Sequence, residues 1–238
     1  MKLLQLVTVV SGLSVVHVIT SANRYLYREE IEEMYALRYH VAVNELGLTI
    51  PNMAEKRDKD AYDREDTVYF LYFDSSGSVI ATARLNPTLR PHLMTDVFSR
   101  LCEFGGVPQA PDIFEYSRFL VKKTGVPRRV NLQAQAHISL AIVEYCLAAN
   151  IKHVSWVSYK RSYPLALRMW KTRPLGLPQY FEADDAHYIA ALSEMSEESL
   201  QRTRDLARIQ RPVCRMTVPL EAAPQLAQLT KPSMTLPG

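Results

Sequence analysis

Apolar residues recur along the chain at spacings that alternate between those of helices and those of strands. Residues 28–45 carry apolar side chains every three or four positions, and acids fill the first turns, where the helix dipole favours negative charge. This pattern predicts an amphipathic helix. Two β-rich runs, 67–73 and 79–85, flank a four-residue polar turn and predict an antiparallel hairpin. The same criteria predict strands at 16–20, 113–121, 153–159, 179–183 and 187–192, and helices at 131–149, 163–172 and 197–209, the last capped by Ser196.

The order of these elements predicts an α/β sandwich around a mixed, largely antiparallel sheet. The chain has 238 residues, of which 47% are hydrophobic, so it can bury a full core, and we expect one compact domain over residues 16–210. Residues 211–238 contain five prolines and predict a tail that lies over the surface or is partly disordered.

The first twenty residues allow two interpretations. A lysine, an apolar run and Thr20-Ser21-Ala22 match a secretory signal peptide with its cleavage site. The alternative is an N-terminal extension over residues 1–15, followed by the first strand. Polar residues and a glycine interrupt the apolar run, so we expect no stable insertion into a membrane.

Composition narrows the classes of function. The 28 basic and 25 acidic residues give a net charge of +3, which is too small to predict binding to nucleic acid. Three widely spaced cysteines encode neither a disulfide framework nor a zinc site, and they fit a reducing cytoplasm. Because no two histidines stand at the i, i+4 spacing of a metalloprotease helix, we expect no bound metal.

The densest charge in the sequence directly precedes a predicted strand. Five acids fall within the nine residues 58–66. Two carboxylates about 4 Å apart repel by roughly 4 kcal/mol at an effective dielectric constant near 20, so positive side chains must meet them. Three arginines that interrupt apolar patterns are candidates, because a buried arginine is normally paired. They are Arg38, Arg84 and Arg118.

The strand predicted at 113–121 has polar residues on both of its faces. Strict alternation places Glu115 and Ser117 on one face and Arg118 on the other. Together with the acids, these residues form either a buried ionic lattice that only ties the first helix to the sheet, or a functional site. The convergence of three arginines and four acids from separate segments favours a site.

Four motifs in a fixed order indicate a family. An arginine on the first helix is followed by Asp58-x-Asp60-x-Tyr62-Asp63, by Gly77 and Arg84-Leu85-x-Pro87-Thr88, and by Glu115-x-Ser117-Arg118-Phe119. This set, which runs from about Val16 to about Tyr188, resembles the acyl-homoserine lactone synthases, the autoinducer synthases of bacterial quorum sensing.

The resemblance implies an acetyltransferase-like, GNAT-related fold, a three-layer α/β sandwich. It also implies a reaction in which the methionine amine of S-adenosylmethionine attacks an acyl thioester, supplied as acyl-coenzyme A or on an acyl carrier protein. Closure of the lactone ring then expels methylthioadenosine, and no further cofactor is implied. Because S-adenosylmethionine carries a sulfonium and an amino group, a carboxylate-rich pocket that excludes water would hold it strongly.

The charged core of the family maps onto this sequence residue by residue. By resemblance, Asp60 and Asp63 would hold the ammonium, Arg38 and Arg84 would brace the acids, and Arg118 would brace them too or contact the carboxylate of the substrate. Glu115 would be the base, since an α-amino group titrates near 8. The implied residues are Glu115, Asp60, Asp63 and Arg84 for catalysis, and Arg38, Asp58, Tyr62, Ser117, Arg118 and Leu48 for binding of S-adenosylmethionine.

Two positions depart from the family pattern. Ala42 stands where an aromatic residue is usual, and Leu48 stands where a tryptophan is usual. Those aromatics are expected to wall the S-adenosylmethionine site. Either the pocket is rebuilt, with Tyr39 or Tyr62 as candidates, or affinity for the nucleotide is lower.

By the same resemblance, the acyl group should lie between the strand 113–121, the helix 131–149 and the strand 153–159, where acetyltransferase-like folds separate two strands. Phe119, Trp156 and Ser158 are candidates for its pocket. A bulky Trp156 there would favour a short, branched or aryl acyl group, unless it is ordinary core.

A basic rim surrounds this predicted opening. It would receive the phosphates of coenzyme A or an acidic carrier protein, unless it is a solvated loop. Its members are Lys122, Lys123, Arg128, Arg129, Lys160 and Arg161.

Two other functions stay open. One is a different N-acyltransferase of the same superfamily, which is less favoured because Thr124-Gly125-Val126-Pro127 offers a single glycine and a proline without an N–H for a pyrophosphate. The other is a catalytically silent module that binds an adenosyl ligand or a partner protein.

Overall fold

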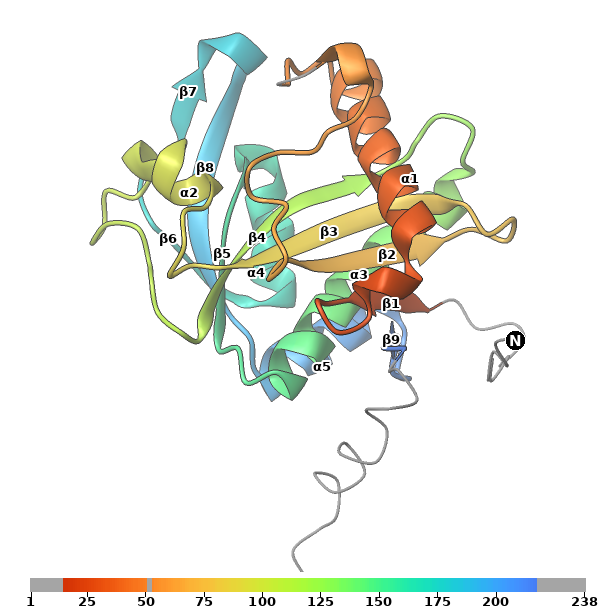
Figure 1. Ribbon diagram of the computed structural model, residues 1–238. Coiled ribbons are helices and arrows are strands. Elements are labelled where there is room, and N and C mark those ends of the chain that lie inside the picture. Colours follow the sequence, from red (N-terminus) through yellow and green to blue (C-terminus); the bar gives the residue numbers. More distant parts are fainter. Residues whose placement is uncertain (1–14, 51–52, 218–238) are drawn as a thin grey trace, which may run out of the picture.

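A computed structural model describes residues 15–50 and 53–217 of the chain (Figure 1). The predicted N-terminal extension up to residue 14, which includes most of the possible signal peptide, and the tail from residue 218 lie outside the described residues. Within the described ranges, no helix is long and apolar enough to cross a membrane.

One sheet of nine strands runs through the described part of the chain. The strands are β1 (Val16–Ile19), β2 (Val68–Phe73), β3 (Val79–Pro87), β4 (Ile113–Val121), β5 (His153–Tyr159), β6 (Lys171–Pro174), β7 (Gln179–Phe181), β8 (Ala186–Glu194) and β9 (Cys214–Arg215). They lie in the order β6-β8-β5-β4-β3-β2-β1-β9, and β7 pairs with β8. Among these strands, β4 with β5 and β1 with β9 pair in parallel and the other pairs are antiparallel, which confirms the predicted mixed sheet.

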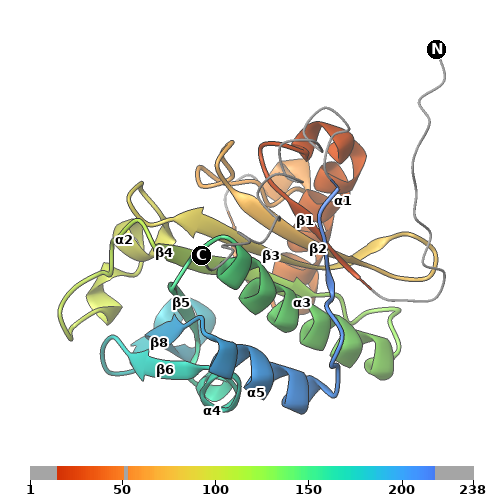
Figure 2. The same ribbon diagram turned by 90° about the horizontal axis from the view of Figure 1, so that it is seen from below.

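Helices cover both faces of the sheet and complete the three layers (Figure 1). On one face lies α1 (Arg28–Tyr39), which continues into a π-helical segment, His40–Glu45, and packs against β3. The opposite face carries α3 (Arg128–Ala148), and α5 (Glu197–Ala207) lies beside it with α4 (Tyr163–Met169) (Figure 2). Shorter helices are α2 (Leu93–Asp96) and the 3-10 turns Arg24–Leu26, Met53–Glu55, Ser99–Leu101, Lys160–Ser162 and Glu182–Asp184.

Most predicted elements are confirmed, but two predictions were wrong at their ends. The helix expected over 163–172 ends at Met169, because Trp170 is extended and the residues from Lys171 alternate in exposure and pair with β8. The segment after residue 211, expected to be a surface tail, adds β9 to the sheet in parallel with β1. Neither β9 nor α2 was predicted, because such short elements carry too little periodicity.

The packing on the two faces differs. Between the sheet and α3, a large apolar core includes Phe70, Leu85, Ile138 and Ile142. Between the sheet and α1, a smaller core is built around Met34, Tyr69 and Leu71. The smaller core ends where polar residues of β3 and β4 begin, so the α1 face has room for a charged site next to an apolar layer.

The central strands β4 and β5 separate partway along their length. Their paired residues run from Ile113 with His153 to Tyr116 with Trp156, although both strands continue beyond these pairs. At the point of separation, a cavity of about 1490 Å³ lies among β4, β5, α3, α4 and α5. The predicted opening between these strands is therefore present.

Candidate active site

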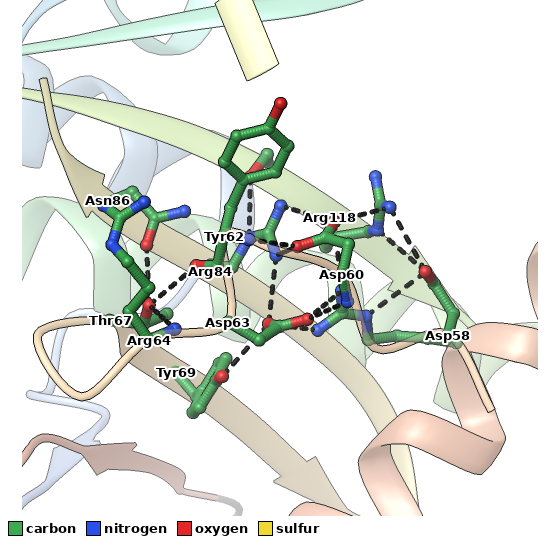
Figure 3. Close-up of polar contacts among 12 residues, drawn as sticks. Asp58, Asp60, Tyr62, Asp63, Arg64, Thr67, Tyr69, Arg84, Asn86 and Arg118 are labelled. Carbon is green, nitrogen blue, oxygen red and sulfur yellow. Dashed lines mark hydrogen bonds and ion pairs between the residues drawn. The ribbon is translucent and has the colours of Figure 1, made fainter. Parts of the chain in front are cut away.

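Three arginines and three aspartates meet on the α1 face of β3 and β4 (Figure 3). The arginines come from three different elements, and the aspartates come from the loop that precedes β2. We call this group the ionic cluster, and its members are Arg38 from α1, Arg84 from β3, Arg118 from β4, Asp58, Asp60 and Asp63. The structure thus brings together the residues that the sequence predicted to converge.

Asp63 occupies the centre of the ionic cluster. Its two oxygens accept hydrogen bonds from Arg38 Nη1 and Nη2 at 2.9 and 3.1 Å, and Arg84 Nη1 lies 3.0 Å from its Oδ1. The Tyr69 hydroxyl donates to Oδ1 at 3.0 Å, and the backbone N–H of Asp60 donates to Oδ2 at 2.9 Å. The side chains of Asp63 and both arginines are 0% exposed. Burial acts to raise the pKa of Asp63, but the two guanidinium groups outweigh it and hold that pKa well below its usual range.

Asp58 and Asp60 lie toward the more open side of the cluster. Arg84 donates to both oxygens of Asp60 at 2.6 and 3.1 Å. Arg118 Nη2 lies 2.8 Å from Asp60, and Arg118 Nε lies 2.7 Å from Asp58. Because the side chain of Asp60 is 10% exposed and that of Arg118 is 21% exposed, this side of the cluster is the one that a ligand can reach.

The prediction that Arg118 faces away from Glu115 and Ser117 was wrong. The register between β3 and β4 shifts between Thr82 and Arg84, and Arg118 has a φ of 53°, in the left-handed region. This β-bulge breaks the period of two and turns the guanidinium toward the aspartates. A left-handed non-glycine residue costs on the order of 1 kcal/mol, which the two ion pairs of Arg118 offset.

Glu115 lies on β4 next to the ionic cluster. It is 2% exposed, and its oxygens accept hydrogen bonds from the backbone N–H groups of Met94 at 2.6 Å and Leu93 at 3.3 Å. Burial raises the pKa of Glu115, and the opposing influences of His92, Arg84 and these N–H groups do not cancel the rise. A carboxylate with a raised pKa is suited to accept a proton near neutral pH.

The loop that carries the aspartates, residues 58–66, forms hydrogen bonds with the segment around α2, and we call it the acidic loop. The Tyr62 hydroxyl donates to Asp96 at 3.0 Å, and the Tyr62 ring centre lies 5.9 Å from the guanidinium carbon of Arg84. Burial, followed by Asp96, raises the pKa of Tyr62 to about 12. Arg64 also donates to the Pro91 carbonyl at 2.7 Å. Tyr62 is thus next to the cluster, as the sequence predicted.

Two further residues predicted for nucleotide binding, Ser117 and Leu48, lie in different places. Ser117 accepts a hydrogen bond from Arg84 Nε at 3.1 Å. Ala42 is buried in the π-helical segment, and half-buried Leu48 donates its backbone N–H to the Ala42 carbonyl. Within the described residues, no group of three or more histidine, cysteine or acidic side chains is arranged to hold a metal ion.

The cavity at the separation of β4 and β5 contains every residue predicted for the acyl pocket. Phe119, Trp156 and Ser158 line it, and Arg128 and Arg129 line it from the first turn of α3. Tyr116 and Trp156, which line the cavity, lie on the α3 face of the sheet, whereas Glu115 lies on the α1 face. The cavity and the ionic cluster are therefore on opposite faces of the sheet.

The predicted basic rim is divided in the structure. Lys122 and Lys123 do not line the cavity; the backbone N–H of Lys123 donates to Glu45 instead. Arg208 and Arg211, which follow α5, do line it, and the sequence analysis missed them. In the sequence, Arg208 lay within the predicted charged helix and Arg211 just after it, and neither position shows where that helix packs.

Comparison with known proteins agrees with this geometry. The model of the autoinducer synthase family matches residues 22–202. An isovaleryl-homoserine lactone synthase of Bradyrhizobium diazoefficiens is 32% identical over 191 residues, which make up 80% of this chain and 84% of that protein. Two structures of the CoA-dependent acyl-homoserine lactone synthase BjaI, one with SAM and isopentyl-CoA and one with MTA, match at 31% identity with TM-scores of 0.75 and cover 91% of this chain and 100% of theirs. The CoA-dependent synthase MesI matches at 29% identity and a TM-score of 0.69, over 84% of this chain and 98% of its own.

The relatives are acyltransferases, and the comparisons place this chain in the same class of enzyme. The chain belongs to the autoinducer synthase family. The prediction of an acyl-homoserine-lactone synthase is thereby confirmed at the level of the family, while the role of each residue in the site stays a prediction.

The buried position of Asp63 generates a prediction about stability. Asp63→Asn should lower the free energy of unfolding by about 3–5 kcal/mol at pH 7, because two buried guanidinium groups lose their shared counter-charge. Since the folded pKa of Asp63 is depressed, its stabilisation is present above the unfolded pKa of about 4 and is lost as pH falls. Urea unfolding should therefore show that the difference in the free energy of unfolding between wild type and Asp63→Asn begins to narrow below about pH 5 and is still narrowing below pH 3.

The matched control is Glu65→Gln on the exposed part of the same loop, which should change stability by less than about 0.5 kcal/mol. If Asp63→Asn lowers the free energy of unfolding by less than about 1 kcal/mol at pH 7, the stability of the cluster does not depend on Asp63.

Proposed function

We propose that this enzyme transfers an acyl group from an acyl-coenzyme A to the methionine amine of S-adenosylmethionine, and that lactone closure then releases methylthioadenosine. The observation that carries the proposal is the opening between β4 and β5. It lies between the ionic cluster on one face of the sheet and the cavity on the other face. Two substrates approaching from opposite faces would meet there. Both are cytoplasmic metabolites, so we place the enzyme in the cytoplasm.

The charge of the site suits S-adenosylmethionine as the acceptor. The ionic cluster has as many arginines as aspartates, and an ionised Glu115 adds one negative charge. S-adenosylmethionine at neutral pH carries a sulfonium, an ammonium and a carboxylate, and so has one net positive charge. A buried site with one excess negative charge would attract such a cation and exclude anionic competitors.

Exposure distinguishes the roles of the two aspartates that were both expected to hold the ammonium. Both oxygens of each aspartate already accept hydrogen bonds, but the side chain of Asp63 is 0% exposed whereas that of Asp60 is 10% exposed. Asp63 therefore braces the site, and Asp60, with its exposed edge, holds the positive charge of the substrate.

Glu115 is the proposed base. The neutral amine attacks the thioester carbonyl carbon, the carbon–sulfur bond of the thioester breaks, and its electron pair leaves with coenzyme A. The proton lost by the nitrogen passes to Glu115, whose raised pKa lets it accept and release protons near neutral pH. An oxygen of the methionine carboxylate then bonds to the γ-carbon, and the carbon–sulfonium bond breaks to give neutral methylthioadenosine.

The distribution of arginines favours coenzyme A over a carrier protein as the donor. Arg128 and Arg129 of α3 and Arg208 and Arg211 after α5 line the cavity itself. Guanidinium groups within a cavity suit phosphates that enter it, whereas a carrier protein would contact an outer surface. That BjaI was solved with SAM and isopentyl-CoA supports the same pair of substrates here.

Trp156 indicates a short or branched acyl group. Its indole is buried, its N–H donates to Ser193 at 2.8 Å, and Ser193 lies 2.8 Å from the Thr172 hydroxyl. The ring is thus fixed in the wall of the cavity just where β4 and β5 separate. A fixed indole there limits the depth available to a straight chain.

The proposal is tested by incubating the protein with S-adenosylmethionine and a panel of acyl-coenzyme A and acyl-carrier substrates, and by identifying the lactone by mass. We expect methylthioadenosine in equal amount to an acyl-homoserine lactone, with a short or branched acyl-coenzyme A turned over best. Calorimetric binding of S-adenosylmethionine without methylthioadenosine release would favour a silent module. Absence of binding would favour another N-acyltransferase.

The role of Glu115 leads to a second prediction. Glu115→Gln keeps the shape of the side chain and removes the base, so kcat should fall by about 10²–10⁴-fold while the affinity for methylthioadenosine, measured by calorimetry, stays within about threefold. The control is Glu55→Gln at an exposed position, which should leave both quantities unchanged. Full turnover by Glu115→Gln would remove Glu115 from the reaction.

The position of Trp156 leads to a third prediction. Trp156→Ala should raise kcat/KM for an eight-carbon straight-chain acyl-coenzyme A relative to isovaleryl-coenzyme A by at least about tenfold, because the pocket becomes deeper. Ser193→Ala removes the hydrogen bond and leaves the indole in place, so it should keep the preference for short chains. An unchanged ratio in Trp156→Ala would mean that the indole is ordinary core.

A further inference from the structure

Asn86 of β3 is a fully buried polar residue beside the ionic cluster (Figure 3). Strand alternation places it on the same face as Arg84, and the register between β3 and β4 pairs it with Glu115. One end of its side-chain amide lies 2.8 Å from the Thr67 hydroxyl oxygen. The other end is buried and has no hydrogen-bond partner among the described residues. A buried polar group without a partner has lost its hydrogen bonds to water, and beside a candidate site it favours a partner that binds there.

The contacts of Thr67 determine which end of the amide is free. A hydroxyl has one hydrogen to donate and two lone pairs that accept. The Arg64 N–H donates to Thr67 Oγ1 at 2.9 Å, and the Tyr62 carbonyl, which can only accept, lies 2.9 Å away and takes the single hydrogen. The contact with Asn86 is therefore satisfied when Asn86 donates. Figure 3 draws the amide with its oxygen toward Thr67 and its nitrogen at the free end, which would require Thr67 to donate its single hydrogen to both Asn86 and the Tyr62 carbonyl. A half-turn about the last side-chain bond exchanges the nitrogen and oxygen of an amide, and the count at Thr67 selects the orientation in which the nitrogen faces Thr67.

In this orientation the unpartnered atom is the amide oxygen, a neutral acceptor. Figure 3 shows the free end of the Asn86 amide pointing away from Thr67, in the direction of Tyr62 and Arg84. The titratable and charged groups around it come from every neighbouring element and are Arg84 on β3, Glu115 on β4, Tyr62 and Arg64 in the acidic loop, and His92 before α2.

The register also shows which substrate Asn86 can meet. Asn86 is level with Glu115, whereas the bulge at Arg118 and the cavity-lining Phe119 lie farther along β4, toward the opening. The acyl donor would enter from the cavity. The group that reaches Asn86 is therefore the group that Glu115 serves, which in the proposed reaction is the amine of the acceptor.

We propose that the amide oxygen of Asn86 accepts a hydrogen bond from the methionine amine of S-adenosylmethionine and so positions the nucleophile beside Glu115. The proposal rests on the function proposed above. A neutral amine has two N–H groups and one lone pair. When Glu115 and Asn86, paired across β3 and β4, hold the two N–H groups, the lone pair points away from both, toward the opening between β4 and β5.

A neutral acceptor is suited to this position for a chemical reason. A second carboxylate would stabilise the ammonium form and raise the pKa of the amine, which would remove the lone pair needed for attack. An amide oxygen orients the N–H without that effect, and it does not compete with Glu115 for the proton released after attack.

The experiment compares wild type with Asn86→Leu, Asn86→Asp and the control Thr82→Val, a buried hydroxyl on the same strand that contacts neither substrate in this scheme. Steady-state rates are measured against pH with saturating acyl-coenzyme A, and affinity for methylthioadenosine, which has no amine, is measured by calorimetry. Asn86→Leu should lower kcat by about 10²-fold and leave that affinity within about threefold. Asn86→Asp should move the rising limb of the rate profile by about one unit to higher pH, because a carboxylate favours the protonated amine. Thr82→Val should match wild type.

Wild-type kcat and an unchanged profile in both Asn86 variants would overturn the proposal, as would a loss of methylthioadenosine affinity equal to the loss of kcat, which would indicate a damaged pocket. If Asn86→Leu fails to fold, the profile of Asn86→Asp, which keeps the shape of the side chain, decides alone. If wild type releases no methylthioadenosine from S-adenosylmethionine, the proposed function itself is wrong and the role of Asn86 falls with it.

Discussion

The site depends on the bridge that Asp63 makes between Arg38 and Arg84. Three buried charges are costly to remove from water, and their attraction compensates only when the geometry is good and the remaining lone pairs are satisfied. Here the Tyr69 hydroxyl and the Asp60 N–H complete the bonding of Asp63. The same bridge joins α1 to β3 and fixes the backbone at Asp60. The position of the reachable carboxylate is therefore a consequence of the buried one.

A single irregularity in β4 shapes the charged site. The bulge at Arg118 turns its guanidinium toward Asp58 and Asp60, although alternation would point it the other way. It lies just beyond Tyr116, where the pairing of β4 with β5 ends. A regular strand would have left Arg118 on the face of the cavity. The charged site therefore depends on a local distortion that lies next to the opening.

Much of this arrangement can be predicted from the sequence, and the exceptions have physical causes. The strands β4 and β5 were predicted at their observed bounds because they have strong periodicity and clear limits. The meeting of arginines with the acidic loop followed from electrostatics, since neither set can be buried alone. The orientation of Arg118 could not be predicted, because a bulge arises from pairing with a neighbouring strand.

Other features depend on contacts between distant segments. Arg208 and Arg211 line the cavity because α5 packs beside α3, which no local pattern encodes. The different roles proposed for Asp60 and Asp63 rest on their different exposure, which the sequence does not show because both residues belong to one short motif. Asn86 looked like an ordinary polar residue near the end of a hairpin strand, and only its burial and the hydrogen-bond count at Thr67 set it apart.

An amine nucleophile places opposing demands on a site like this one. Carboxylates attract the protonated amine from solution, yet the same charges stabilise the form that cannot attack. In the proposed reaction the ionic cluster would resolve this conflict, because each aspartate is paired with at least one guanidinium and the site keeps little net charge to hold the proton of the amine. The remaining carboxylate, Glu115, has a raised pKa because it is buried, and its opposite neighbour Asn86 is uncharged. In the proposed reaction, pairing most of the acids with arginines would thus allow the site to bind a cation and still use its deprotonated amine as a nucleophile.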